Sequence, residues 1–261
     1  MKGIKTAWFF GSMVNGKRNK DSDIDLAIVL EDYKYRDSIE RELYYPSLDI
    51  TFMDVNEFTE KVEYNDYLLA SVIQDSVFFI GDKDLFEKKK RRIFSKKPDK
   101  KSIRYNYVQS LYAYDSASIS YHNFRYFHRK AHMNTSDLEK LKEAVLKDEV
   151  VRGPCKMERI KSTNRYLMLV SVNDIDMKIA RKYLEDTIKN CEFSAGYLYA
   201  SKLMKELNRT VTIKDLEGKD NLFSEIHKFV KYYKRTRKAD IDTVNSMIYS
   251  VWKELNASSV L

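Results

Sequence analysis

The chain has 261 residues, of which 43% are hydrophobic and 33% charged, so it can bury a core and is too apolar to be disordered. Its two cysteines, Cys155 and Cys191, have no partner at metal-ligand spacing, which excludes a disulfide framework and predicts a cytoplasmic protein. The apolar run at 7–10 is too short for a signal peptide or a membrane span, so we expect a soluble protein.

Charge is divided unevenly along the chain. Residues 1–84 contain 10 Lys and Arg against 17 Asp and Glu, a net charge of −7. Residues 85–261 contain 37 basic and 22 acidic residues, a net charge of +15. This change of sign predicts two regions that face different partners, although a generally basic surface is the alternative interpretation.

The first third of the chain alternates between strand and helix patterns. Short apolar, β-branched runs predict strands at 5–10, 24–30, 48–53 and 77–80. Helical patterns lie between or beside them, at 13–17, 55–62 and 65–73. The alternation predicts a mixed β-sheet with helices, and hence an α+β fold for this region.

Helical periodicity dominates after residue 83. A basic helix at 84–94 runs into Pro98, which marks a boundary because the residue before proline disfavours helix. The segment 165–171 fits either a strand or a buried helix. We therefore predict a mixed-sheet domain at 1–95 and a mainly helical domain at 96–261. The further predicted helices are 103–120, 137–146, 177–191, 193–207, 222–233 and 241–255.

Three aspartates fall on the predicted strands in a pattern typical of a metal site. Asp23 and Asp25 are two residues apart, so both point to one face, and Asp49 alternates with the apolar residues of a later strand. If the strands pair, the three carboxylates converge and repel one another unless a cation lies between them. Oxygen ligands favour Mg²⁺ or Mn²⁺, and two such ions suit an in-line phosphoryl displacement.

A Gly-Ser turn follows the first predicted strand. Gly11 lets the backbone approach a phosphate closely, and the Ser12 hydroxyl adds a hydrogen-bond donor. Lys17, in the segment between the turn and Asp23, fits two roles, neutralising phosphate charge or forming part of the solvated surface. The turn and the carboxylates together predict a binding site for a nucleoside triphosphate.

This arrangement resembles the DNA polymerase β nucleotidyltransferase superfamily, and is similar especially to its minimal and antibiotic-modifying branches. The resemblance covers about residues 1–95 and rests on the Gly-Ser turn, the Asp-Ile-Asp-Leu segment ten residues later at 23–26, and Asp49. It implies that Gly11 and Ser12 bind the triphosphate, that Asp23 and Asp25 bind both metal ions, and that Asp49 lies near the acceptor hydroxyl. Many members have Arg or Ala and then Gly after the turn, and here only Gly16 matches.

The resemblance implies transfer of a nucleoside monophosphate from an NTP to an acceptor hydroxyl, with release of pyrophosphate. A basic tract in the 84–94 helix favours RNA, for example a 3′ end, as the acceptor, because positive charge binds the phosphate backbone. Its residues, which we predict to bind nucleic acid, are Lys88, Lys89, Lys90, Arg91 and Arg92.

Other interpretations stay open. An antibiotic or a protein can be the acceptor, and a non-catalytic module that binds nucleotide or RNA is the rival from another class. Arg125 and His132 fit the loose pattern of HEPN ribonucleases, which many unrelated sequences share. The sequence does not choose the NTP, the oligomeric state, or an auxiliary base among Glu143, Glu149 and Glu185.

Overall fold

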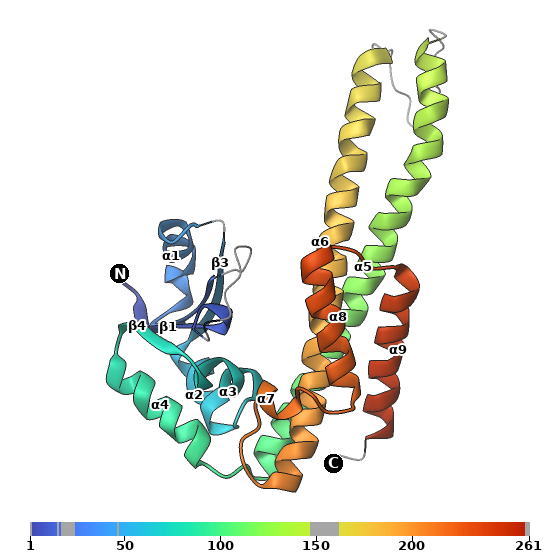
Figure 1. Ribbon diagram of the computed structural model, residues 1–261. Coiled ribbons are helices and arrows are strands. Elements are labelled where there is room, and N and C mark those ends of the chain that lie inside the picture. The colour runs from blue at the N-terminus through green and yellow to red at the C-terminus, as the bar shows by residue number, and fades with distance from the viewer. Residues whose placement is uncertain (1, 15, 17–23, 46, 147–161, 259–261) are drawn as a thin grey trace.

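The computed structural model describes residues 2–14, 16, 24–45, 47–146 and 162–258. An N-terminal sheet with helices is followed by a mostly helical part (Figure 1), which confirms the predicted α+β class. In chain order the elements are β1 (Ile4–Phe10), the 3₁₀ helix η1 (Gly11–Met13), β2 (Ile24–Leu30), the 3₁₀ helix η2 (Tyr33–Tyr35), α1 (Arg36–Glu42), β3 (Leu48–Asp54), α2 (Val55–Glu63), α3 (Tyr67–Gln74), β4 (Val77–Gly81), α4 (Lys83–Ser95), α5 (Lys100–Leu146), α6 (Ser162–Leu207), α7 (Ile213–Leu216), α8 (Leu222–Thr236) and α9 (Ile241–Ala257).

The sheet has four strands in the order β3-β2-β1-β4. β1 is antiparallel to both of its neighbours, β2 and β4, whereas β2 and β3 are parallel. The four predicted strands are confirmed to within one residue at each end. The sheet is therefore mixed, as the alternation of strand and helix patterns predicted.

The two faces of the sheet are covered by different helices, because alternate residues of each strand point in opposite directions. On one face Leu26, Ile28 and Leu30 of β2 pack with Ile39 of α1. On the other face Trp8 is completely buried, with the rings of Phe58 and Phe86 at centroid distances of 5.4 and 5.3 Å. This second face is covered by α2, α3 and α4.

Each helix on the second face begins with an aspartate that accepts a hydrogen bond from the backbone N–H three residues later. The distances are 2.8 Å from Asp54 to Glu57, 2.7 Å from Asp66 to Leu69 and 2.8 Å from Asp82 to Leu85. Such caps satisfy a backbone donor that the helix itself leaves unpaired. They fix where α2, α3 and α4 start.

The helical part differs from the sequence prediction in the length of its helices. The predicted helices at 103–120 and 137–146 are parts of one 47-residue helix, α5. The ambiguous segment at 165–171 lies within α6, a helix of 46 residues. The two form a long antiparallel hairpin that extends beyond α8 and α9 (Figure 1). The short helices α1 and α7 were not predicted.

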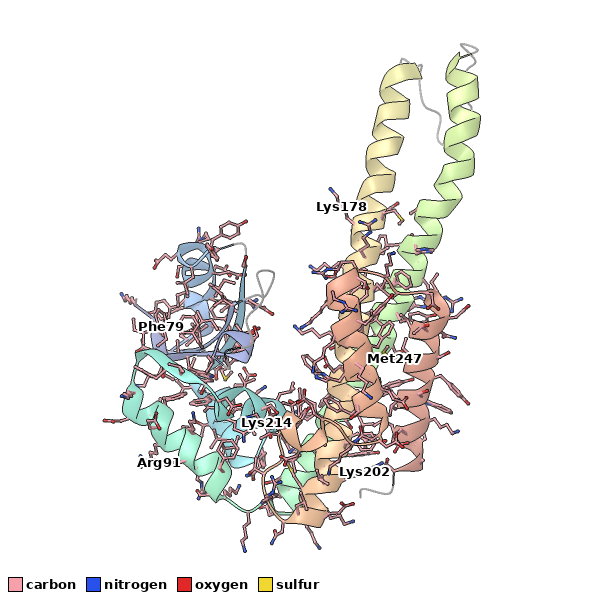
Figure 2. The ribbon with its side chains drawn as sticks, in the orientation of Figure 1. Phe79, Arg91, Lys178, Lys202, Lys214 and Met247 are labelled. Atoms are coloured by element: carbon pink, nitrogen blue, oxygen red, sulfur yellow. The ribbon has the colours of Figure 1, made fainter. Side chains whose placement is uncertain are left out.

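The core of the helical part includes a residue from the sheet-bearing part. Side chains of α5, α6, α8 and α9 form one apolar cluster, and Met247 of α9 points into it (Figure 2). Tyr67 of α3 is 1% exposed within this cluster, and its ring meets those of Tyr197 and Phe223 edge-on at 5.6 and 6.5 Å. None of the described helices is long and apolar enough to cross a bilayer.

A buried polar cluster reinforces this junction. Asn65 lies between α2 and α3 with φ of 50°, and its amide donates to the carbonyl oxygens of Ile93 and Lys96 and to Oγ1 of Thr210, at 2.7–3.0 Å. Its side-chain oxygen accepts from Ser102 of α5 at 3.1 Å. One side chain thus links the junction of α2 and α3 to the end of α4, the start of α5 and Thr210, which is 145 residues away.

Candidate functional site

Two of the three predicted carboxylates are neighbours on adjacent strands. Asp25 of β2 and Asp49 of β3 are direct partners in the parallel register, one residue after each strand begins. Paired residues of neighbouring strands point to the same face, and their backbones are about 4.8 Å apart. Asp49 is exposed and Asp25 half-buried, so this end of the sheet presents negative charge to solvent.

The Gly-Ser turn lies at the same end of the sheet. Phe10, the last residue of β1, is the partner of Asp25, so the chain enters the turn directly beside that carboxylate. Gly11 has φ of 75°, and a Cβ built there would overlap the Asp25 carboxyl group, lying 3.0 Å from its carbon. Only glycine fits this close approach. Ser12 follows, half-buried, in η1.

The donor set fits a hard divalent cation. Two carboxylates at neighbouring strand positions repel each other, and a bound cation relieves that repulsion. Within the described part of the chain, no group of three or more His, Cys, Asp or Glu side chains is arranged to hold a metal ion. Asp23, which is the remaining predicted metal ligand, lies outside the described residues, as does Lys17, the predicted phosphate contact.

We predict that Gly11→Ala lowers kcat for the nucleotidyl transfer expected from the sequence by about a hundredfold, because the new methyl group displaces the Asp25 carboxylate. Gly218→Ala is the matched control, since Gly218 has a φ of 76° and no atom within 4 Å of an added Cβ. Both variants strain the backbone, by about 1–2 kcal/mol, which thermal denaturation measures. Equal activity of the two variants would contradict the close approach of Gly11 to the Asp25 carboxyl group.

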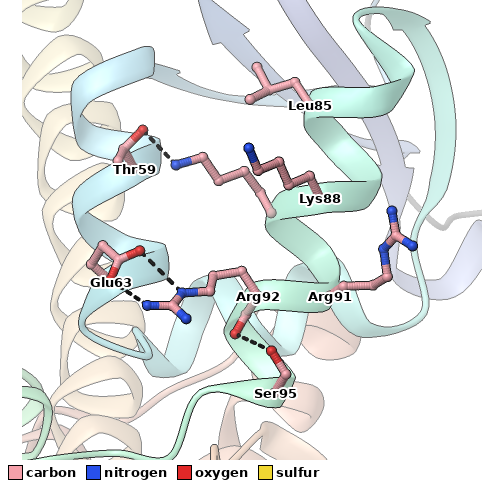
Figure 3. Close-up of a pocket in the computed structure, with 8 residues that line it drawn as sticks. Thr59, Glu63, Leu85, Lys88, Arg91, Arg92 and Ser95 are labelled. Atoms are coloured by element: carbon pink, nitrogen blue, oxygen red, sulfur yellow. Dashed lines mark hydrogen bonds and ion pairs between the residues drawn. The ribbon is translucent and has the colours of Figure 1, made fainter.

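The basic tract of α4 is wound around the helix. Consecutive helical residues are about 100° apart, so five in a row cannot share one face. Figure 3 shows Arg92 turned towards Glu63 of α2, 3.4 Å away, and Arg91 on the opposite side of α4. Arg91 also points away from the fold in Figure 2. The residues that were predicted to bind nucleic acid therefore lie on two different sides of α4.

Several basic side chains of α4 already bind groups within the fold. Lys89 Nζ donates to Thr59 Oγ1 at 3.0 Å, and partial burial lowers the pKa of its ammonium group. Lys90 Nζ donates to the Ser76 carbonyl oxygen at 3.3 Å. The Arg92 guanidinium lowers the pKa of Glu63 through its hydrogen bond. Lys88 and Arg91 remain exposed, beside a shallow pocket of about 670 Å³ between α2 and α4 (Figure 3).

The other candidates from the sequence are dispersed. Glu185 of α6 accepts a hydrogen bond from Arg237 at 2.9 Å, in the helical part. Arg125 of α5 lies over the Tyr121 ring at 5.8 Å. The side chains of Glu143 and His132, and the whole of Glu149, lie outside the described part of the chain.

Sequence reasoning gave no role to two exposed tyrosines in the loop before β3. Tyr44 and Tyr45 precede β3, with side chains 81% and 59% exposed. The available signal was the Tyr-Tyr-Pro-Ser segment at 44–47, directly before the strand that carries Asp49.

Comparison with known proteins finds a family that matches the sheet-bearing part of the chain. The family model described as "Polymerase beta, Nucleotidyltransferase" matches residues 1–84, which run from the N-terminus through β4 to the start of α4. None of the curated proteins compared with the chain matches it. Residues 1–84, with their mixed sheet, Gly-Ser turn and paired aspartates, belong to the polymerase beta nucleotidyltransferase superfamily.

Proposed function

We propose that the protein transfers a nucleoside monophosphate from an NTP to an acceptor hydroxyl, and that RNA is the acceptor. The observation that carries the proposal is the register of Asp25 and Asp49, which places two carboxylates side by side next to the Gly11 turn. In this proposal Asp23, Asp25 and Asp49 hold two Mg²⁺ or Mn²⁺ ions. Gly11, Ser12 and Lys17 contact the triphosphate.

In the reaction the acceptor oxygen bonds to the α-phosphorus of the NTP while the bond from that phosphorus to the bridging oxygen breaks. Pyrophosphate leaves with that oxygen, and the acceptor hydroxyl loses its proton. Bound divalent ions supply the positive charge that lowers the pKa of the hydroxyl and neutralises the pyrophosphate. In this proposal Asp49, exposed at the start of β3, helps to remove that proton. The amides that follow Gly11 orient the phosphates.

The charge distribution supports a polyanionic acceptor. The catalytic part carries the net charge of −7 and residues 85–261 carry +15, so the helical region attracts phosphate. A cationic antibiotic prefers acidic walls, which this region lacks overall. We therefore propose that residues 1–95 form the catalytic domain and that residues 96–261 form the domain that binds the acceptor. A cytoplasmic location fits the free thiol of Cys191, whose pKa burial raises to about 12.

The test is a transfer assay with Mg²⁺, each α-labelled NTP in turn, and total RNA, a cationic antibiotic or a protein lysate as the acceptor. We expect label on RNA from the wild-type protein, and none with EDTA or with the Asp23→Ala/Asp25→Ala variant. If the label appears on the antibiotic or on protein instead, that molecule and not RNA is the acceptor. If no acceptor is labelled and the variant still binds nucleotide and RNA normally, the chain is a non-catalytic binding module.

A further inference from the structure

Positive charge is concentrated on the outer face of α8 and the two residues that follow it. Residues 222–238 contain six Lys and Arg side chains, all exposed, against a single acid, Glu225, which gives a net charge of +5. One side of the helix is buried in the core of the helical part, through Phe223, Ile226, Val230 and Tyr233. Lys228, Lys231 and Arg235 are three and four residues apart, so they share the opposite, exposed side.

Most of these cations are not neutralised within the fold. Lys231 Nζ is paired with Glu217 at 3.2 Å, and the Arg237 guanidinium is paired with Glu185 at 2.9 Å. Among the residues that the structure describes, the other four cations form no ion pair, and they are Lys228, Lys234, Arg235 and Lys238. The tract of α4 differs in this respect, because three of its five basic side chains donate to groups of their own fold.

Exposed cations of α6 continue this surface. Burial raises the pKa of the Tyr233 hydroxyl, and Arg237 and Arg181 lie close enough to oppose that shift. Cations from α6 and from the end of α8 therefore meet around this ring. Lys178, three residues before Arg181, extends from α6 on the side nearer to the sheet-bearing part (Figure 2). In Figure 1 α8 lies on that side of the hairpin and α9 on the other.

The helix α9 carries no comparable charge. Residues 240–257 contain three acidic side chains and one basic side chain, a net charge of −2. The exposed rings of α9, Tyr249 and Trp252, stack on each other with centroids 5.7 Å apart. Charge is thus divided unevenly between the two helices that cover the hairpin, which a generally basic surface does not explain.

The exposed side of α8 has the chemistry that single-stranded RNA requires. Cations one helical turn apart, about 5–6 Å, bind successive phosphates of a flexible chain. Tyr232 lies between Lys228 and Arg235 on the same side and is 44% exposed, so its ring is free to stack on an unpaired base. A membrane surface does not fit, because the apolar side of α8 is buried in the core and cannot enter a bilayer.

We infer that the exposed side of α8 binds the phosphate backbone of the acceptor RNA and that Tyr232 stacks on one of its bases. The inference rests on the proposed function for RNA as the acceptor. It deepens that proposal by assigning RNA binding to one surface of the helical part, formed by Lys228, Lys231, Tyr232, Lys234 and Arg235.

The first test is the triple variant Lys228→Gln/Lys234→Gln/Arg235→Gln of the full-length protein. It replaces three unpaired cations by a neutral residue of similar helix propensity, so the thermal unfolding temperature should be unchanged. Binding of a short, labelled, single-stranded oligouridylate is measured between about 50 and 200 mM salt. We expect binding at 0.1 M salt to weaken about a hundredfold, and the slope of log K against log salt to become less steep by about 2.

The matched control is Lys100→Gln/Lys101→Gln/Arg104→Gln, which removes the same charge from exposed positions in the first two turns of α5. It should bind the oligouridylate with nearly wild-type affinity and an unchanged salt slope. An equal loss in both triple variants shows that only net charge matters and overturns the inference. Wild-type affinity of the α8 variant overturns it as well, as does a wild-type protein that does not bind the oligouridylate.

A second pair of variants tests the stacking of Tyr232. Tyr232→Ala should weaken binding about tenfold without changing the salt slope, whereas Tyr232→Phe keeps the ring and should bind normally. Tyr249→Ala, which removes a 61% exposed ring from α9, is the control and should also bind normally. Normal binding by Tyr232→Ala overturns the role assigned to the ring.

Binding is measured without turnover, so the outcome separates this inference from the proposed function. A protein that binds RNA through α8 and labels no acceptor overturns only the proposed function. A protein that labels RNA while the α8 triple variant binds normally overturns only the inference.

Discussion

Replacement of Asp25 by Asn is expected to lower kcat for nucleotidyl transfer by roughly a thousandfold. The amide keeps the shape of the side chain and removes the negative charge that holds the metal ions. Asp49→Asn, on the partner position of β3, is expected to show a loss of the same order. Because each carboxylate contributes to one shared site, the double variant should lose little more than either single variant. Initial rates with saturating Mg²⁺ measure these effects.

The control for this prediction is Glu31→Gln. Glu31 is exposed and follows β2 at the end opposite to Asp25, so its replacement removes the same charge far from the site. We expect it to keep full activity. All three variants should unfold at nearly the wild-type temperature, since each replaces an exposed or half-buried carboxylate by an amide of the same shape. A fully active Asp25→Asn enzyme would rule out the proposed metal site.

The second large effect is expected at Asn65. Asn65→Ala should lower the free energy of unfolding by about 3–5 kcal/mol, because it leaves buried partners of the amide and of the side-chain oxygen without a hydrogen bond. Asn65 is fully buried and its backbone has a φ of 50°, which alanine adopts with strain. Asn65→Gly removes the same hydrogen bonds without that strain, so it should be about 1 kcal/mol less destabilising. Urea denaturation followed by circular dichroism measures both.

The matched control is Asn56→Ala, which replaces the same residue type at an exposed position of α2. We expect it to change the free energy of unfolding by no more than about 0.5 kcal/mol. If Asn65→Ala proves equally mild, water molecules replace the lost hydrogen bonds and the cluster is not a structural centre.

The strands and the position of the carboxylates could be predicted from the sequence because both depend on local patterns. Alternation places Asp25 and Asp49 on the same side of the sheet, at the starts of strands whose later apolar residues are buried on both faces. The parallel pairing of β2 and β3 that makes them neighbours depends on the crossover through α1, which was not predicted. That helix has seven residues and a single buried side chain, Ile39, so its sequence lacks an apolar periodicity.

Other features were unpredictable because they depend on distant partners. The Asn65 amide bonds to Thr210, which is 145 residues away, and nothing near Asn65 in the sequence indicates that contact. The basic tract of α4 was recognised as a run of charge, whereas its binding partners within the fold, such as Thr59 and Glu63, were determined by packing of α4 against α2. The exposure of Tyr44 likewise follows from tertiary structure.

The length of α5 has a mechanical consequence. At 1.5 Å per residue, its 47 residues make a rod about 70 Å long. The rod starts beside Ser102, which donates a hydrogen bond to Asn65, so we take that end as the pivot of a rigid tilt. A tilt of about 5° at the pivot displaces the far end by roughly 6 Å, about one helical turn. The length of α5 therefore gives any rearrangement at its first turns a lever arm of about 70 Å.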